Sequence, residues 1–156
     1  MKAAVKLAGV IAVLAPVQAF AATGNIPFNG TVSDTCIITV GSSGTITPNT
    51  AFTVLGSTQP GGAPGTATIL ATGSGFDVFA DAPSAWGTAP ASASSAVFAT
   101  TYSLSGANTA SNVAGTTGTA LSNFGTTNVS VDMSATLPSG TYEAGTYAAT
   151  VVLRCE

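Results

Sequence analysis

Few of the 156 residues carry side chains that could do chemistry. The sequence has two cysteines, six Asp or Glu, three Lys or Arg, and no histidine. Without histidine, neither a Ser-His-Asp nor a Cys-His relay can be built, and a metal finds no imidazole ligand. Three cations cannot neutralise a run of nucleic-acid phosphates. We therefore predict that the protein is not an enzyme, uses no metal or cofactor, and binds no nucleic acid.

The remaining polar and aromatic candidates give weaker signals. Asp77 and Asp81 flank a short apolar run, and two such carboxylates with backbone carbonyls could bind calcium. The surrounding loop is not rich in Asp, so we interpret both as solvated loop charges. Trp86 lies in a loop flanked by Pro and Gly. It could stack on a sugar, but a hydrophobic plug at the end of the fold is the favoured interpretation.

The first 21 residues have the order of a secretory signal peptide. The basic stretch from Met1 to Lys6 is followed by the apolar run from Leu7 to Val17 and by a small-x-small site at residues 19–21. The apolar run is too short to span a bilayer. Without residues 1–21, Arg154 is the only cation beside six acidic residues. We therefore expect an acidic, exported protein.

Export determines how the two cysteines are interpreted. Two thiols in an oxidising compartment most simply form one disulfide, so we predict a bond between Cys36 and Cys155. A zinc site would need more ligands than two cysteines provide. In the chain-entropy model, closing a loop of roughly 120 residues stabilises the fold by about 4 to 5 kcal/mol.

The hydrophobic pattern that must position these residues has a period of two. From Asn128 to Leu137, apolar and polar residues alternate strictly, which predicts a strand with one solvent-exposed face. Tyr147 to Cys155 alternates in the same way and places Cys155 on the apolar face. Gly106 to Thr127 is expected to be a long exposed connection. Further candidate strands lie at residues 45–55, 66–71, 76–80 and 98–104.

Glycine- and proline-rich breakers separate these segments. Seven or eight short strands in about 130 residues predict an all-β fold, an immunoglobulin-like sandwich. We expect no helix of useful length after residue 21.

The segment that follows the expected cleavage site is the most informative part of the chain. One face of it carries three apolar residues and a glycine: Ile26, Phe28, Gly30 and Val32. Pro27 has no amide donor, so the segment suits an edge or terminal strand better than a central one. The same alternation continues through Cys36 and Ile38 to Val40.

These features together resemble the pilin subunits of the chaperone–usher pathway. In that family a signal peptide precedes an apolar-x-apolar-x-Gly-x-apolar stretch and a cysteine that opens the first strand, as in IPFNGTVSDTC at residues 26–36. This chain also closes with the alternating strand GTYAATVVLRC at residues 145–155. The resemblance implies an incomplete sandwich whose groove is filled by the N-terminal segment of the next subunit. It also implies a structural role in a surface pilus, or fimbria, that mediates cell adhesion.

The resemblance divides the chain into a signal peptide (1–21), a donor-strand extension (22–34) and a pilin-like domain (35–156). It implies that Ile26, Phe28 and Val32 enter pockets of a neighbouring subunit, and that Gly30 lies where a larger side chain would clash. The acceptor groove is expected to be lined by Ile38, Val40, Tyr147, Val151 and Leu153. The implied partners are copies of the chain, a periplasmic chaperone and an outer-membrane usher, met during export through the periplasm to the cell surface.

Two features depart from the family pattern. The second cysteine is the penultimate residue instead of following the first by a few tens of residues, and no tyrosine lies nearer the C-terminus than Tyr147. A bond between Cys36 and Cys155 would join the strands that flank the groove, so it either braces the groove or closes the sandwich. The alternative is therefore a non-polymerising secreted β-sandwich, a surface coat or adhesive module whose N-terminal strand folds back. Low charge and many hydroxyls also suit a host or surface glycan as partner.

Overall fold

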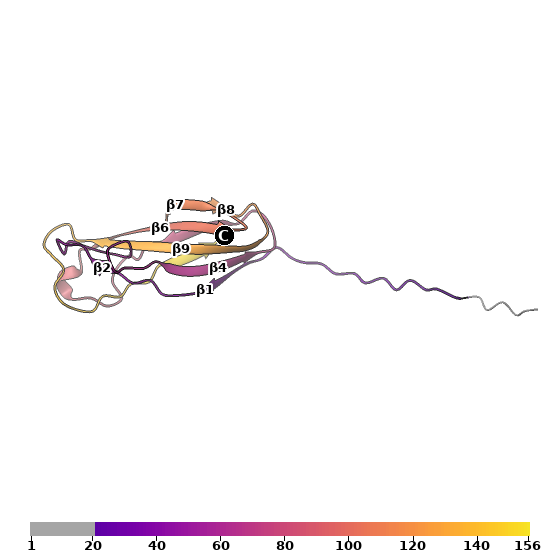
Figure 1. The fold of residues 1–156 in the computed structure, drawn as a ribbon, viewed down its shortest axis with the longest axis horizontal. Helices are drawn as coiled ribbons and strands as arrows, with labels where there is room; N and C mark the ends of the chain where they lie inside the picture. Colours follow the sequence, from indigo (N-terminus) through magenta and orange to yellow (C-terminus); the bar gives the residue numbers. More distant parts are fainter. Residues whose placement is uncertain (1–20) are drawn as a thin grey trace, which may run out of the picture. The chain divides into compact units, whose positions relative to one another are not determined.

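The computed structural model describes residues 21–156 (Figure 1). The predicted signal peptide lies outside the described residues, except for Ala21. The chain divides into two units, one ending at Gly30 and one from Thr31 to Glu156. In the first unit, residues 21–30 are all exposed and none is in a strand. The second unit contains all the secondary structure of the described chain.

The second unit is an antiparallel all-β structure, as predicted. Its strands are β1 (Cys36–Val40), β2 (Thr47–Pro48), β3 (Val54–Gly56), β4 (Gly65–Ala71), β5 (Asp77–Asp81), β6 (Val97–Gly106), β7 (Ala110–Ala114), β8 (Thr119–Ala120), β9 (Gly125–Thr136) and β10 (Val152–Cys155). One short 3-10 helix, η1 (Ala91–Ala93), interrupts them. No helix in residues 21–156 is long and apolar enough to cross a membrane.

The strands form two sheets. Across the larger sheet the order is β1, β4, β9, β6, β7, with β3 and then β2 beside the second half of β9 (Figure 1). The smaller sheet has the order β10, β5, β8. In an immunoglobulin constant domain the two sheets are ABED and CFG. Here β1, β4, β9 and β6 occupy the A, B, E and D positions, and β5 and β10 occupy C and F.

The G position is the difference from a complete immunoglobulin sandwich. Strand G would lie beside strand F, which is β10 here. Among the described residues, β10 pairs only with β5, so no strand fills that position. The immunoglobulin-like sandwich of residues 31–156 therefore has six of the seven expected positions filled, together with the short strands β2, β3, β7 and β8. Its completion by a donor strand stays a prediction.

Period-two alternation positions the core. In β9, Val129 and Ala135 are buried while Asn128 is exposed, as the pattern predicted. The main core lies between the sheets and consists of Ala67, Ile69, Ala71, Val78, Ala80, Tyr102, Leu104, Leu121 and Val129. Full burial of a side chain such as Ile69 stabilises the fold by about 1.5 to 3 kcal/mol. A second cluster, centred on Leu137, lies beyond one end of it.

The prediction of a long exposed connection from Gly106 to Thr127 was wrong. Strands β7 and β8 lie within it, pairing with β6 and β5, and Leu121 is fully buried. The segment was misjudged because its strands are short and consist mostly of Ala, Ser, Thr and Asn, which give little hydrophobic alternation. Asn112 also adopts a φ of 50°, which breaks the regular pattern.

Candidate functional site: a groove between the first and last strands

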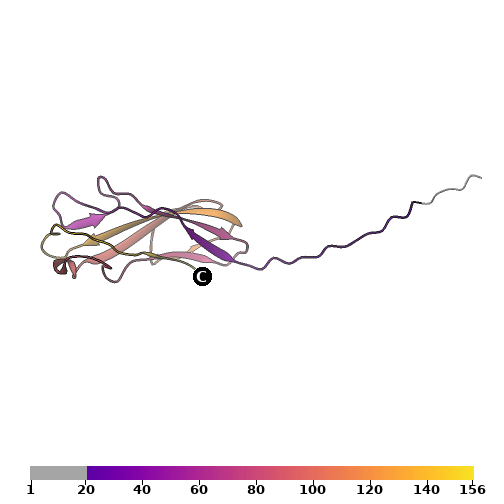
Figure 2. The same ribbon diagram turned by 90° about the horizontal axis from the view of Figure 1, so that it is seen from below.

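Strands β1 and β10 are both edge strands, and they belong to different sheets. Strand β1 pairs only with β4, and β10 pairs only with β5. The start of β1 lies beside the end of β10, because Cys36 and Cys155 form the predicted disulfide. Figure 2 views this region from below, with the C-terminus near the start of β1. The two strands therefore run antiparallel, and neither outer edge has a partner within the described residues.

Alternate residues of β1 leave their backbone groups at the free edge. At the end of the β1–β4 ladder, the amide of Gly41 donates to the carbonyl of Thr66 (2.8 Å). Residues of an antiparallel pair alternate between bonding and non-bonding positions. The odd-numbered residues of β1 therefore bond to β4. The backbone N–H and C=O groups of Cys36, Ile38 and Val40 face the free edge.

The C-terminal strand has the same property. Glu156 and Asp77 exchange backbone hydrogen bonds of 3.0 and 2.7 Å, which places the even-numbered residues of β10 against β5. The backbone groups of Val151, Leu153 and Cys155 consequently face the other free edge. Edges of this kind can pair with an added extended segment.

The side chains of these same residues point between the sheets. Ile38, Val151 and Leu153 are half-buried and pack against the main core. A groove of about 640 Å³ runs between the two edges. All five residues predicted to line an acceptor groove line it: Ile38, Val40, Tyr147, Val151 and Leu153.

Sequence reasoning missed the floor of the groove. Ala67 of β4 and Val131 and Met133 of β9 lie beneath it, and Ile46 and Ala149 add to its walls. The alternation of residues 128–137 already placed Val131 and Met133 on the apolar face. Which side chains of that face would lie beneath the groove depends on the register of β9 against β4. That register is not visible in a single strand.

The disulfide closes one end of the groove. A strand inserted between two others holds them about 9.5 Å apart. The Cα atoms of Cys36 and Cys155 are only 6.3 Å apart, so no strand fits between them. The other end, at Gly44 and Tyr147, carries no such bond. From there an extended segment could enter and run toward the disulfide.

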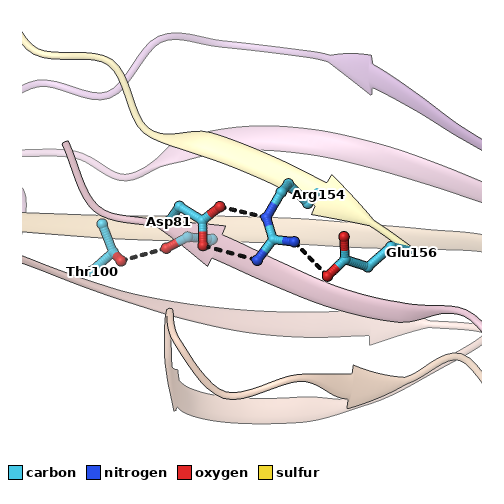
Figure 3. Close-up of polar contacts among 5 residues, drawn as sticks. Asp81, Thr100, Arg154 and Glu156 are labelled. Atoms are coloured by element: carbon cyan, nitrogen blue, oxygen red, sulfur yellow. Dashed lines mark hydrogen bonds and ion pairs between the residues drawn. The ribbon is translucent and has the colours of Figure 1, made fainter. Parts of the chain in front are cut away.

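The lining of the groove contains no charged side chain. Arg154 forms ion pairs with Asp81 and Glu156 on the outer face of the smaller sheet (Figure 3). Its guanidinium lies 4.8 Å from the centre of the Phe79 ring. The hydrogen bond from Arg154 lowers the pKa of Asp81. Asp81 is thus a structural ion-pair partner. Residues 21–156 contain no cluster of three or more side chains that could hold a metal.

Tyr147 is fixed at the open end by aromatic packing. Trp86 contacts it edge-on at 5.4 Å between ring centres, and Phe98 packs against Trp86 at 4.9 Å. The Tyr147 hydroxyl donates to the carbonyl of Glu143 (2.7 Å), and partial burial raises the pKa of Tyr147. Trp86 therefore packs as the hydrophobic plug that the sequence favoured, and it positions one wall of the groove.

The expected donor residues are exposed. The exposed fractions are 77% for Ile26 and 92% for Phe28 in the first unit, and 84% for Val32 in the second. A Cβ atom built on Gly30 meets no atom within 4 Å. A larger residue at position 30 is therefore compatible with the chain's own structure.

Comparison of the chain with family models, with curated proteins and with solved structures gave no match.

Proposed function

We propose that this protein is a structural subunit of a surface pilus that mediates cell adhesion and polymerises by donor-strand exchange. The segment at residues 22–34 of one copy would fill the groove between β1 and β10 of the next. The observation that carries the proposal is the unfilled G position. There, two free edges present unpaired backbone groups, and the same residues direct apolar side chains into one groove.

The dimensions and chemistry of the donor segment match the groove. Ile26 to Val32 and Tyr147 to Leu153 span the same number of residues, about 20 Å each at roughly 3.3 Å per residue. Both alternate with a period of two, so main-chain pairing at the edges and side-chain insertion can occur together. The donor face is apolar and the groove lining is uncharged.

The free edges favour a protein that polymerises over one that stays monomeric. Proteins that stay monomeric protect such edges with lysine, proline, bulges or a covering segment. Neither β1 nor residues 147–153 contain a charged residue or a proline, and Arg154 of β10 forms ion pairs with Asp81 and Glu156 on the outer face. An exported chain with these edges is suited to pairing with another strand.

Two features oppose the alternative in which the N-terminal strand folds back. The hydroxyl of Thr72 in the second unit accepts from the amide of Thr35 and donates to the carbonyl of Ser33, both at 2.9 Å. This ties the residues that precede β1 to the side of β4, away from the free edge. A chain entering its own groove would also have to start at the end that the Cys36–Cys155 bond closes. A strand from a second copy can enter at the open end.

The remaining roles follow from the resemblance and are part of the proposal. Residues 1–21 would direct export, and a periplasmic chaperone and an outer-membrane usher would protect and deliver the subunit before assembly at the cell surface. We assign the chain no catalytic role.

The test is gel electrophoresis, without reductant, of material sheared from the surface of cells that produce the full chain. We expect a ladder of multimers that persists without boiling and collapses on boiling, because donor strands bind without covalent bonds. Deleting residues 22–32, or replacing Gly30 by Leu, should give exported, folded monomers. Asn29→Ala is the matched control, because its side chain lies on the opposite face of the donor segment, and it should leave the ladder intact.

A folded wild-type monomer that the deletion leaves unchanged would overturn the proposal. A ladder that collapses only with reductant would indicate disulfides between chains instead. If the deletion lowered the melting temperature of a monomer, the fold-back alternative would be correct.

A further inference from the structure

The Cys36–Cys155 disulfide occupies an unusual place for an inter-sheet bond. In immunoglobulin domains the bond joins strands B and F across the centre of the sandwich. Here it joins the strands in the A and F positions, at the edge and at the closed end of the groove. It is therefore the one covalent link between the two walls of the proposed acceptor groove.

No other polar contact ties these walls together. Among the described residues, no hydrogen bond or ion pair joins residues 36–46 to residues 147–156. Strand β10 is also held by its short ladder with β5, by the ion pair of Arg154 with Asp81, and by the packing of Leu153 against the core. The ladder and the ion pair fix β10 to its own sheet and form no bond to β1.

The opposite side of the sandwich does not depend on the disulfide. The hydroxyl of Thr100 donates to the carbonyl of Ala80 (2.5 Å), linking β6 to β5 (Figure 3). The amide of Ala80 donates to the carbonyl of Gly115 (3.0 Å), and the hydroxyl of Tyr102 lies 2.7 Å from the carbonyl of Val78. None of these contacts between the sheets involves a cysteine.

We propose that the disulfide controls acceptance of a donor strand: the oxidised chain accepts and donates, whereas the reduced chain donates but does not accept. This inference rests on the proposed function. The bond would form by exchange with a disulfide oxidant of the export compartment. Two cysteine thiols lose two protons and two electrons, and the S–S bond of the oxidant is reduced to two thiols. With the bond in place, the two edges are pre-organised at one end for an added strand, and pre-organisation lowers the cost of binding.

The donor function is separate because the donor segment contains no cysteine and lies outside β1. A chain without the disulfide still exposes Ile26, Phe28 and Val32. A chain with Gly30→Leu keeps the groove but loses the donor. The two variants are therefore complementary, and each isolates one half of the exchange.

The experiment co-produces full chains of the double variant Cys36→Ala/Cys155→Ala with full chains of Gly30→Leu. Exported material is analysed on unboiled gels, and mass spectrometry identifies the chains in each band. We expect each variant alone to be monomeric and the mixture to give one-to-one heterodimers. Acceptance by the double variant should fall by at least about tenfold relative to wild type. Wild-type chains that are treated with dithiothreitol and then mixed with Gly30→Leu chains should behave like the double variant.

Thr100→Val is the matched control for general loss of stability. It removes a hydrogen bond between the sheets on the side away from the groove and keeps the disulfide, so it should still accept strands. If the double variant polymerises like wild type, or if Thr100→Val loses acceptance equally, the proposal is wrong. The fluorescence of Trp86 reports whether the double variant is folded. If it shows an unfolded chain, the bond is a general structural link and the proposal is also overturned. A wild-type monomer would instead refute the proposed function itself.

Discussion

The two long sides of the sandwich are joined in contrasting ways. On one side, which we term the closed side, strand β5 of the smaller sheet is hydrogen-bonded to the larger sheet. The bonds involve Thr100 and Tyr102 of β6, and Gly115, which follows β7. On the other, the open side, β1 and β10 face each other across a groove and are linked by one disulfide. The closed side is complete within a single chain, whereas the open side leaves two strand edges without a partner among the described residues.

Under the proposed function, stability and assembly depend on separate parts of the molecule. Tyr102 is 1% exposed and its hydroxyl lies among three oxygen atoms, so the closed side has little freedom. Val40, on the open side, is 77% exposed. Substitutions on the closed side should mainly change the free energy of unfolding, and substitutions on the open side should mainly change polymerisation.

Gly115→Ala should produce the largest loss of stability. A Cβ atom at this position would overlap the carbonyl of Ala80 and the hydroxyl of Thr100, so both sheets would have to shift. We expect the free energy of unfolding to fall by about 3 kcal/mol, measured by urea denaturation. Gly87→Ala is the control, because its nearest neighbour would lie at an ordinary 3.5 Å. Equal stability of the two variants would contradict the close approach at Gly115.

Tyr102→Phe should have the next largest effect. It leaves the carbonyls of Val78 and Thr117 without this hydroxyl in a buried position, which costs about 1 to 3 kcal/mol. Polymerisation should be unchanged, because the ring still fills the core. Tyr147→Phe is the comparison: it loses one hydrogen bond at an exposed site and should cost under about 1 kcal/mol. The proposed division would fail if Tyr102→Phe blocked assembly without changing stability.

Alkaline pH should weaken the closed side through Tyr102. Burial raises the pKa of Tyr102 above its ordinary value of 10.0, so the neutral hydroxyl is the form that the folded state favours. Its contribution is therefore complete below pH 10 and is lost as the pH rises through the folded-state pKa. Denaturation followed from pH 9 to 12 should show a decline that Tyr102→Phe reduces. Tyr142 and Tyr147 also have raised pKa values. If Tyr102→Phe loses stability with rising pH as much as the wild type does, the loss is due to Tyr142 and Tyr147 instead.

Leu153→Ala should have the smallest effect on the folded monomer and a clear one on assembly. Leu153 is half-buried and lines the groove, so its truncation should cost about 1 kcal/mol of stability, less than a fully buried leucine. The multimer ladder should shorten, because a donor side chain loses its contact. Ile37→Ala is the control, because Ile37 of β1 is 52% exposed and does not line the groove. Equal ladders from the two variants would argue against the groove as the acceptor.

Local patterns predicted the strands with strong alternation and missed those without it. Residues 128–137 correspond to β9, and 66–71 to β4, because alternating side chains need one dry and one wet face. Strands β7 and β8 were missed, since their Ala, Ser, Thr and Asn residues carry little hydrophobic signal. All five proposed groove residues line one groove. Three of them, Ile38, Val151 and Leu153, share the predicted inward faces of the first and last strands with the two cysteines.

The sequence by itself determined the all-β class, the pairing of its two cysteines, and the inward face of the first and last strands. Each of these depends on local alternation or on counting two thiols. Only the tertiary structure decided that β1 and β10 are edges of different sheets, that β9 forms the floor between them, and that the disulfide closes one end of the groove. These properties depend on strand order and register, which arise from pairing between residues distant in sequence. No local pattern records which edge is left without a partner.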